Sequence, residues 1–152
     1  MSDPIIFDTT SPRFGLPLLF VGQSQKEAFV NEALSLADAL LHCAIEGVAS
    51  APPASPVDGT NWLVGTSATG AWAGNDGKIA CRQAGNWLYV TASDGMRVLD
   101  RSIGQERLYR SGWQVPAVPA APSGGSTVDT ESRTAITALI AALRQAGIFP
   151  TT

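Results

Sequence analysis

The sequence has little charge for its size. Charged residues make up 15% of the 152 residues, whereas hydrophobic residues make up 45%. A folded chain that exposes most of its surface needs more charge to stay soluble, so this balance favours burial in an assembly. The formal net charge is −3. A negative chain lacks the basic surface that binds phosphates, so we expect no nucleic-acid partner.

Residues that carry chemistry are also scarce. The two cysteines, Cys43 and Cys81, form no metal-binding or CxxC spacing, and we expect Cys43 to be a buried free thiol. A Ser–His–acid arrangement would have to use the single histidine, His42, but the sequence contains no nucleophile motif such as GxSxG. A carboxylate pair of the glycosidase kind remains open, but most of the available acids precede glycine, where turn chemistry explains them. These acids are Asp58, Asp76, Asp94, Asp100 and Glu106. We therefore expect no enzyme, no metal and no cofactor.

Long hydrophobic runs are missing too. The most apolar window, residues 14–21, is short and contains Pro17, so it cannot span a membrane. The first eight residues, MSDPIIFD, carry acids and a proline where a signal peptide needs basic and apolar residues. We expect a chain made in the cytoplasm, without a signal peptide and without membrane insertion.

The longest helical pattern covers residues 25–46. Ser24 and Glu27 have the spacing of a capping box, and Gly47 suits the residue that closes a helix. One narrow polar stripe leaves the helix apolar nearly all round, which is typical of burial on several sides. Either the chain wraps this helix itself, or copies of the helix meet around a symmetry axis. Residues 1–22 are apolar but rich in proline and glycine. They predict an extended arm that packs along its own helix or docks on a neighbouring protein.

Residues 60–115 change to short aromatic and β-branched runs between glycines, which predicts a small antiparallel sheet with a marginal core. A linker rich in proline, alanine and glycine follows at 116–128. A second helix is predicted from Asp129 or Thr130 to about Ala146, with Gly147 as its stop signal. Its apolar residues repeat at a/d spacing, so it needs a partner: two further copies in a bundle, or the body of its own chain.

Two sets of candidate contact residues follow from these patterns. The candidate oligomer interface is Phe29, Leu36, Leu40, Cys43, Ile136, Leu139 and Leu143. The candidate glycan contacts are Trp72, Asn75, Asp76 and Trp113. Sugars stack on exposed indole faces, although Trp72 could equally cap the small core. Arg97, Arg101, Arg107 and Arg110 could bind an acidic polysaccharide or could line a solvated strand face.

Several segments resemble a domain family of formally unknown function from tailed phages, prophages and gene transfer agents of alphaproteobacteria. The residues that carry the likeness are Leu16-Pro17, Gln23, Gln25-Lys26-Glu27 and Asn31 to Leu34, followed by the Thr69–Gly74 segment, LYRSGWQ at 108–114 and the terminal helix. The resemblance implies a virion protein of the tail-fibre or spike kind, a trimer, and no catalytic residues.

Together these observations predict an α+β fold with an extended N-terminal arm, a long central helix, a small antiparallel β-sheet block and a separate C-terminal helix. The expected divisions are an attachment arm at 1–22, a helix-plus-β domain at 23–115, the linker at 116–128 and the C-terminal helix at 129–149. The expected function is a trimeric structural component of a phage-like particle that attaches to the host cell surface. Its expected partners are its own copies and other virion proteins of tail or capsid, and its expected location is the virion. The alternative is a carbohydrate-binding module, or a head spike, that binds bacterial surface polysaccharide.

Overall fold

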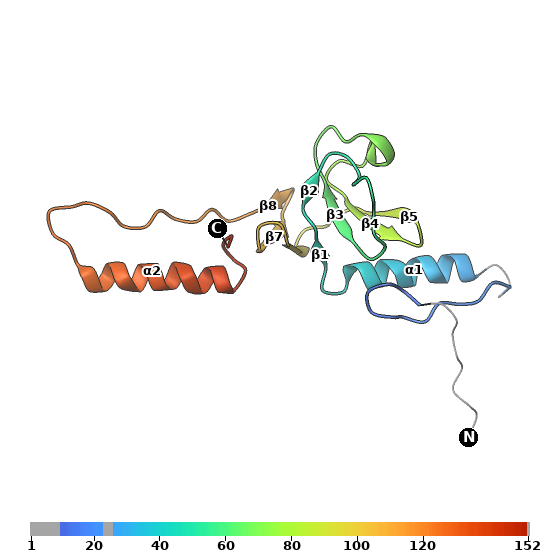
Figure 1. Cartoon of the computed structure of the whole chain (residues 1–152), viewed down its shortest axis with the longest axis horizontal. Coiled ribbons are helices and arrows are strands. Elements are labelled where there is room, and N and C mark those ends of the chain that lie inside the picture. The colour runs from blue at the N-terminus through green and yellow to red at the C-terminus, as the bar shows by residue number, and fades with distance from the viewer. Residues whose placement is uncertain (1–9, 23–25, 152) are drawn as a thin grey trace, which may run out of the picture. The chain divides into compact units, whose positions relative to one another are not determined.

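The computed structural model describes residues 10–22 and 26–151, and it divides into two compact units (Figure 1). Unit 1 covers Met1–Ala92 and unit 2 covers Ser93–Thr152. The boundary between the units falls inside the region predicted as one helix-plus-β domain.

The predicted architecture around a long central helix is wrong. Within the described residues the fold has two α-helices and eight strands, so it consists mostly of sheet. The first helix, α1, spans Glu27–Leu40 and has 14 residues. The expected helical residues beyond it instead form β1, Ala44–Ile45. A short apolar run such as LLHCAI fits a helix or a buried strand equally well, and here tertiary contacts decide for the strand.

Unit 1 is built on a four-stranded sheet in the order β2-β3-β4-β5. The outer strand β2 runs parallel to β3, whereas β3, β4 and β5 pair antiparallel. Helix α1 contacts the sheet at β4. The strands are β2, Val48–Ala49; β3, Asn61–Val64; β4, Ile79–Gln83; and β5, Asn86–Val90.

The β4–β5 hairpin is closed by Ala84 and Gly85. Both residues have positive φ angles, 47° and 74°, which is the signature of a type I′ turn. The Asp-Gly dipeptides, which the sequence marked as hairpin turns, lie elsewhere: Gly77 and Gly95 precede strands rather than join two of them. The hairpin therefore uses a turn that residue preferences alone did not indicate.

One face of the unit 1 sheet is covered by Trp72. This residue lies on the short 3-10 helix η1, Gly70–Trp72, and its side chain is fully buried against Val64 and Ala80. Trp62 and Trp87 flank it, with ring centroids 6.2 and 5.1 Å away. Because side chains alternate along a strand, the neighbouring residues Leu63, Ile79 and Cys81 form the opposite face.

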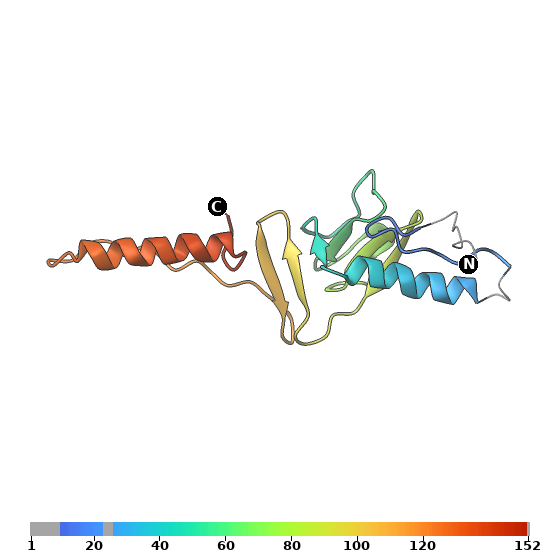
Figure 2. The same ribbon diagram turned by 90° about the horizontal axis from the view of Figure 1, so that it is seen from below.

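Residues 10–22 run back along α1 as a strap (Figure 2). The side chain of Asn31 holds the backbone of Leu19 at both ends, accepting from its N–H at 2.8 Å and donating to its carbonyl at 3.0 Å. The carboxylate of Glu27 accepts from the Gly22 N–H at 3.2 Å. Ser24, the other half of the predicted capping box, lies outside the described residues. Of the two placements left open for this segment, residues 10–22 take the one along their own helix.

The C-terminal end of α1 is held by a buried polar cluster. The Asp38 carboxylate accepts from the Ser11 hydroxyl at 2.6 Å and from the backbone N–H groups of Arg13 and Phe14 at 3.0 and 2.7 Å. The Arg13 guanidinium donates to the backbone carbonyls of Asp38 at 2.6 Å and Ala39 at 2.8 Å, and also to two carbonyls beyond the helix. Asn61 on β3 donates to the Ala39 carbonyl at 3.0 Å. These donors satisfy carbonyls that a helix end leaves unpaired, so the helix stops at Leu40.

Unit 2 contains an antiparallel arrangement of β6, β7 and β8, followed by a long exposed connection and a second helix. Asp129 caps this helix as predicted: its carboxylate accepts from the Ser132 N–H at 2.8 Å, and this bond lowers the pKa of Asp129. Gly147 ends the helix with a left-handed φ of 71°, also as predicted. The elements are β6, Arg97–Asp100; β7, Gln105–Tyr109; β8, Trp113–Gln114; and α2, Thr130–Gln145.

Neither helix among residues 10–22 and 26–151 has the length and apolarity that a membrane-spanning segment requires.

Replacing Asp38 with alanine should destabilise unit 1. The carboxylate is fully buried and accepts three hydrogen bonds, so its removal leaves buried donors unpaired. We expect a loss of about 3 kcal/mol in the free energy of unfolding, measured by urea denaturation. Glu32→Ala, which removes an exposed carboxylate from the same helix, is the control. Equal effects of the two substitutions would contradict the role given to Asp38.

The two cysteines predict a loss of stability at high pH. Both are free and buried, and burial raises the pKa of Cys43 and raises that of Cys81 from 9.0 to about 12. The folded state therefore keeps protons that the unfolded chain releases above pH 9, so stability is complete below pH 9 and falls as the pH rises toward 12. By pH 10.5 the contribution of Cys81 to this loss should be on the order of 2 kcal/mol.

Urea denaturation between pH 7 and pH 10.5 measures this loss. Cys81→Ala is the matched variant, because it removes the thiol and should flatten the pH dependence relative to the unmodified chain. Identical pH profiles for the two proteins would show that Cys81 does not contribute.

Candidate assembly surface

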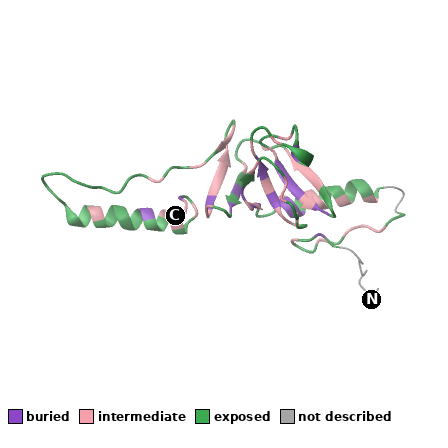
Figure 3. Ribbon diagram, turned by 45° about the horizontal axis from the view of Figure 1, so that its top comes forward, coloured by how far each residue is buried: buried purple, intermediate pink, exposed green. Residues whose placement is uncertain are grey.

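Helix α2 carries an apolar face that its own unit leaves exposed. Ile136 is 41% exposed and Leu139 is 59% exposed, and Leu143, one turn further on, is half-buried. Only Ile140 is buried along the whole helix, as the single purple segment of α2 in Figure 3 shows. The flanking positions Ala135 and Ala142 are also exposed. We call Ile136, Leu139, Leu143, Ala135 and Ala142 the α2 apolar face.

The helix is nevertheless fixed at its C-terminal end. Gln105 at the start of β7 donates from its side-chain amide to the carbonyls of Pro116 at 2.8 Å and Ile148 at 2.6 Å. The Glu106 N–H donates to the Gly147 carbonyl at 2.7 Å. The apolar face is therefore presented on a helix whose end is anchored to the sheet of unit 2.

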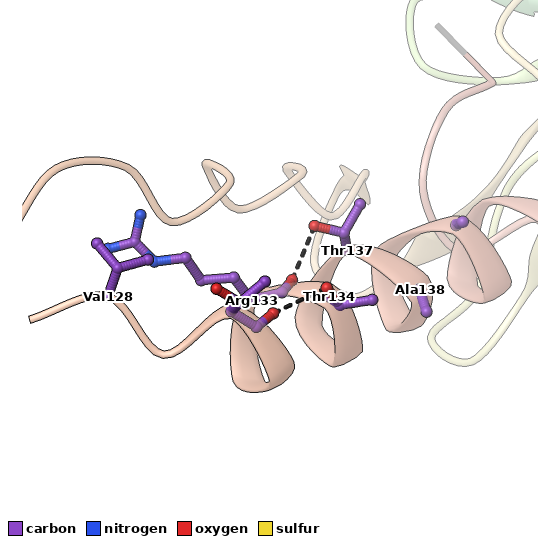
Figure 4. Close-up of a pocket in the computed structure, with 7 residues that line it drawn as sticks. Val128, Arg133, Thr134, Thr137 and Ala138 are labelled. Atoms are coloured by element: carbon purple, nitrogen blue, oxygen red, sulfur yellow. Dashed lines mark hydrogen bonds between the residues drawn. The ribbon is translucent and has the colours of Figure 1, made fainter.

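A second side of α2 forms a groove with the connection that precedes it. The groove has a volume of about 450 Å³ and is walled by Val128 together with threonine and alanine residues of the first three turns (Figure 4). The hydroxyls of Thr134 and Thr137 donate back to helix carbonyls at 2.8 and 2.9 Å, so they turn mainly methyl groups to the groove. The Arg133 guanidinium donates to the Gly124 carbonyl and ties the connection to the helix. The sequence analysis singled out none of these positions, so it missed the groove.

The α1 residues predicted for the oligomer interface do not form one exposed seam. Phe29 is 79% exposed, but Leu36 and Leu40 are half-buried and Cys43 is buried within unit 1. The seven-residue spacing of Phe29, Leu36 and Cys43 does not continue along the structure, because Cys43 lies beyond the end of the helix. The exposed residues of the predicted interface are thus Phe29 on α1 and Ile136 and Leu139 on α2.

The predicted glycan contacts are distributed over both units. Trp72 is fully buried and offers no indole face to a sugar. The Asp76 carboxylate accepts from the N–H groups of Ser67 and Ala68 at 2.8 and 3.0 Å, and the Asn75 side-chain carbonyl accepts from the Lys78 amine at 3.0 Å. These groups hold the loop that carries Trp72. In unit 2, Trp113 is half-buried and packs edge-on against Tyr109, with ring centroids 5.2 Å apart.

The charged residues near the strands are used in structure. Arg97 pairs with Glu106 at 3.0 Å, and Arg107 pairs with the fully buried carboxylate of Asp100 at 2.7 Å. Arg97 and Arg107, both from the predicted basic strip, therefore already have acidic partners. His42, expected on the long helix, instead lies in the turn after α1 with a positive φ of 46°. In the described part of the chain, no group of three or more His, Cys, Asp or Glu side chains is placed to hold a metal ion.

Comparison with known families finds a match for the part of the chain that contains the strands. The family model DUF2793, described as a protein of unknown function, matches residues 30–114. The chain belongs to the DUF2793 family. No curated protein matches it.

The DUF2793 domain ends where β8 ends, so α2 and the connection before it lie outside the matched residues. At the other end, the match begins inside α1 and leaves out the strap at residues 10–22. The α2 apolar face therefore lies outside the residues that the family model matches.

The burial of Trp72 predicts a structural effect for Trp72→Ala. Removing the indole leaves a cavity between Trp62 and Trp87, and we expect a loss of about 3–5 kcal/mol in the free energy of unfolding. Thermal and urea denaturation measure it. Trp113→Ala is the matched control and should cost clearly less, because Trp113 is only half-buried. An unchanged stability for Trp72→Ala would show that the residue is not the centre of this core.

Proposed function

We propose that this chain is a structural component of a phage-like particle, of the tail-fibre or related host-attachment kind, and that it assembles as a homotrimer through α2. The observation that supports this proposal most is the exposed α2 apolar face, with Leu139 59% exposed on an ordered helix. Apolar side chains repeated at helical spacing have a lower free energy when they pack against identical helices than when they face water.

The width of the α2 apolar face favours three helices over two. Ile136, Leu139 and Leu143 have the a/d spacing of a coiled coil. Ala135 and Ala142, both exposed, widen the apolar surface beside this seam. A two-helix coil buries only a narrow stripe, so a wider face is used more fully when each helix contacts two neighbours.

The assignment to a particle is supported by the resemblance of the sequence to proteins of phages and gene transfer agents and by its composition. Charged residues at 15% suit a protein that covers much of its surface with other copies and other virion proteins. Residues 10–22 are bound to their own helix, so attachment to the particle or to the host is assigned to the outer surfaces of the assembly rather than to this strap. The rival function as a carbohydrate-binding module loses its main candidate contact, because Trp72 is buried.

Leu139→Glu should divide the mass of the assembly by three. The substitution places a carboxylate at the centre of the proposed three-helix contact, where like charges would face one another in a dry seam. Multi-angle light scattering measures the mass in multiples of the 15.8 kDa chain. Val57→Glu, at a position 64% exposed in unit 1, is the control and should leave the mass unchanged. An unmodified chain whose mass is the same as that of Leu139→Glu would overturn the proposal.

A further inference from the structure

The strand β5 leaves one edge of the unit 1 sheet open. It is the last strand in the order β2-β3-β4-β5, and its five residues read NWLYV. Natural proteins usually protect such an edge with lysine, proline or a bulge, because its free backbone groups attract other strands. β5 contains no charged residue and no proline.

The hydrogen bonds of β4 decide which groups of β5 face outward. Arg82 and Lys78 point their backbone groups toward β3. The Arg82 N–H donates to the Thr60 carbonyl at 2.9 Å, and the Lys78 carbonyl accepts from the Val64 N–H at 2.9 Å. The alternate residues of β4 therefore point their backbone groups to β5, where Cys81 is in register with Leu88.

It follows that Trp87 and Tyr89 turn their N–H and C=O groups away from the sheet. No turn, loop or cap hydrogen bond among the described residues uses these four groups. The side-chain hydroxyl of Tyr89 is occupied by the Ala71 carbonyl, which holds the strand in place without covering its edge.

We propose that this edge pairs with the same edge of a second copy, antiparallel and centred on Leu88. In this register Trp87 lies opposite Tyr89 of the partner subunit, and by symmetry Tyr89 lies opposite Trp87 of the partner subunit. All four outward groups then find partners, which gives four hydrogen bonds between the copies. The contact is isologous, because each strand presents the same pattern that it receives.

The side chains fit this register as well. On one face, each Trp87 lies beside a Tyr89, and aromatic cross-strand pairs of this kind stabilise sheets. On the other face, Leu88 meets Leu88 of the partner subunit at a closely spaced, non-hydrogen-bonded pair. Because β5 carries no charged side chain, no like charges face each other between the two paired strands. This complementarity favours a second copy over an unrelated extended peptide.

The β5 contact is separate from the α2 contact of the proposed function, since the two lie in different units. The tests can therefore be kept apart by working in the Leu139→Glu background. In that background, light scattering should give twice the 15.8 kDa chain mass. A single-chain mass at all concentrations would overturn the β5 proposal and leave the α2 proposal standing.

Charge at Leu88 tests the register. In the Leu139→Glu background, Leu88→Lys and Leu88→Glu each place like charges directly opposite each other, so each protein alone should have the mass of one chain. An equimolar mixture of the two should return to twice that mass, because lysine then faces glutamate. Val57→Lys, at an exposed position outside β5, is the control and should stay paired. Pairing that persists in either Leu88 variant, or a mixture that stays unpaired, would refute the register.

Amide hydrogen exchange in the Leu139→Glu protein tests the same contact even if the Leu88 variants fail to fold. The Trp87 and Tyr89 amides should exchange slowly at high protein concentration and at least tenfold faster on dilution. The Leu88 amide, which is bonded within the sheet, should stay protected throughout and serves as the internal control. Fast exchange of the Trp87 and Tyr89 amides at every concentration would exclude the pairing.

Discussion

The structure of unit 1 depends on the polar cluster at the C-terminal end of α1. The carboxylate of Asp38, which belongs to the helix, binds the backbone of the strap. The guanidinium of Arg13, which belongs to the strap, binds the last carbonyls of the helix. Asn61 adds a bond from β3. One buried site thus joins the strap, the helix and the sheet. Because the Asp38 carboxylate and the Arg13 guanidinium bind backbone groups on both sides of this site, the cluster determines where the helix ends and where the first strands begin.

The two proposed contacts use opposite kinds of surface. The α2 apolar face offers side chains with no backbone groups to satisfy, so its association is driven by burial and is tolerant of register. The β5 edge offers backbone donors and acceptors at fixed spacing, so its pairing is directional and has one register. A chain with both can build a trimer with one and join such trimers with the other. Low charge is compatible with both surfaces, because neither carries a like-charge barrier to self-association.

Local signals with one physical meaning were predicted correctly. Asp129 and Gly147 mark the beginning and end of α2 as expected, because a cap and a left-handed glycine act on backbone groups of their own helix. Ile136 and Leu139, which their spacing places on one face of this helix, are both exposed there. The prediction failed where one apolar run fits two structures: Leu40 to Ile45 continues the helical pattern, but the bonds of Arg13 and Asn61 end the helix first.

The sequence by itself determined the helix α2 with its apolar face and the presence of short strands between glycines. These features depend on neighbours within a few residues. Only the tertiary structure decided that Trp72 is a core residue and that β5 is an edge strand. Burial of an indole depends on which loop folds over which sheet face, and an edge exists only relative to the order of strands. Both are set by contacts between residues far apart in the chain, and no local pattern contains that information.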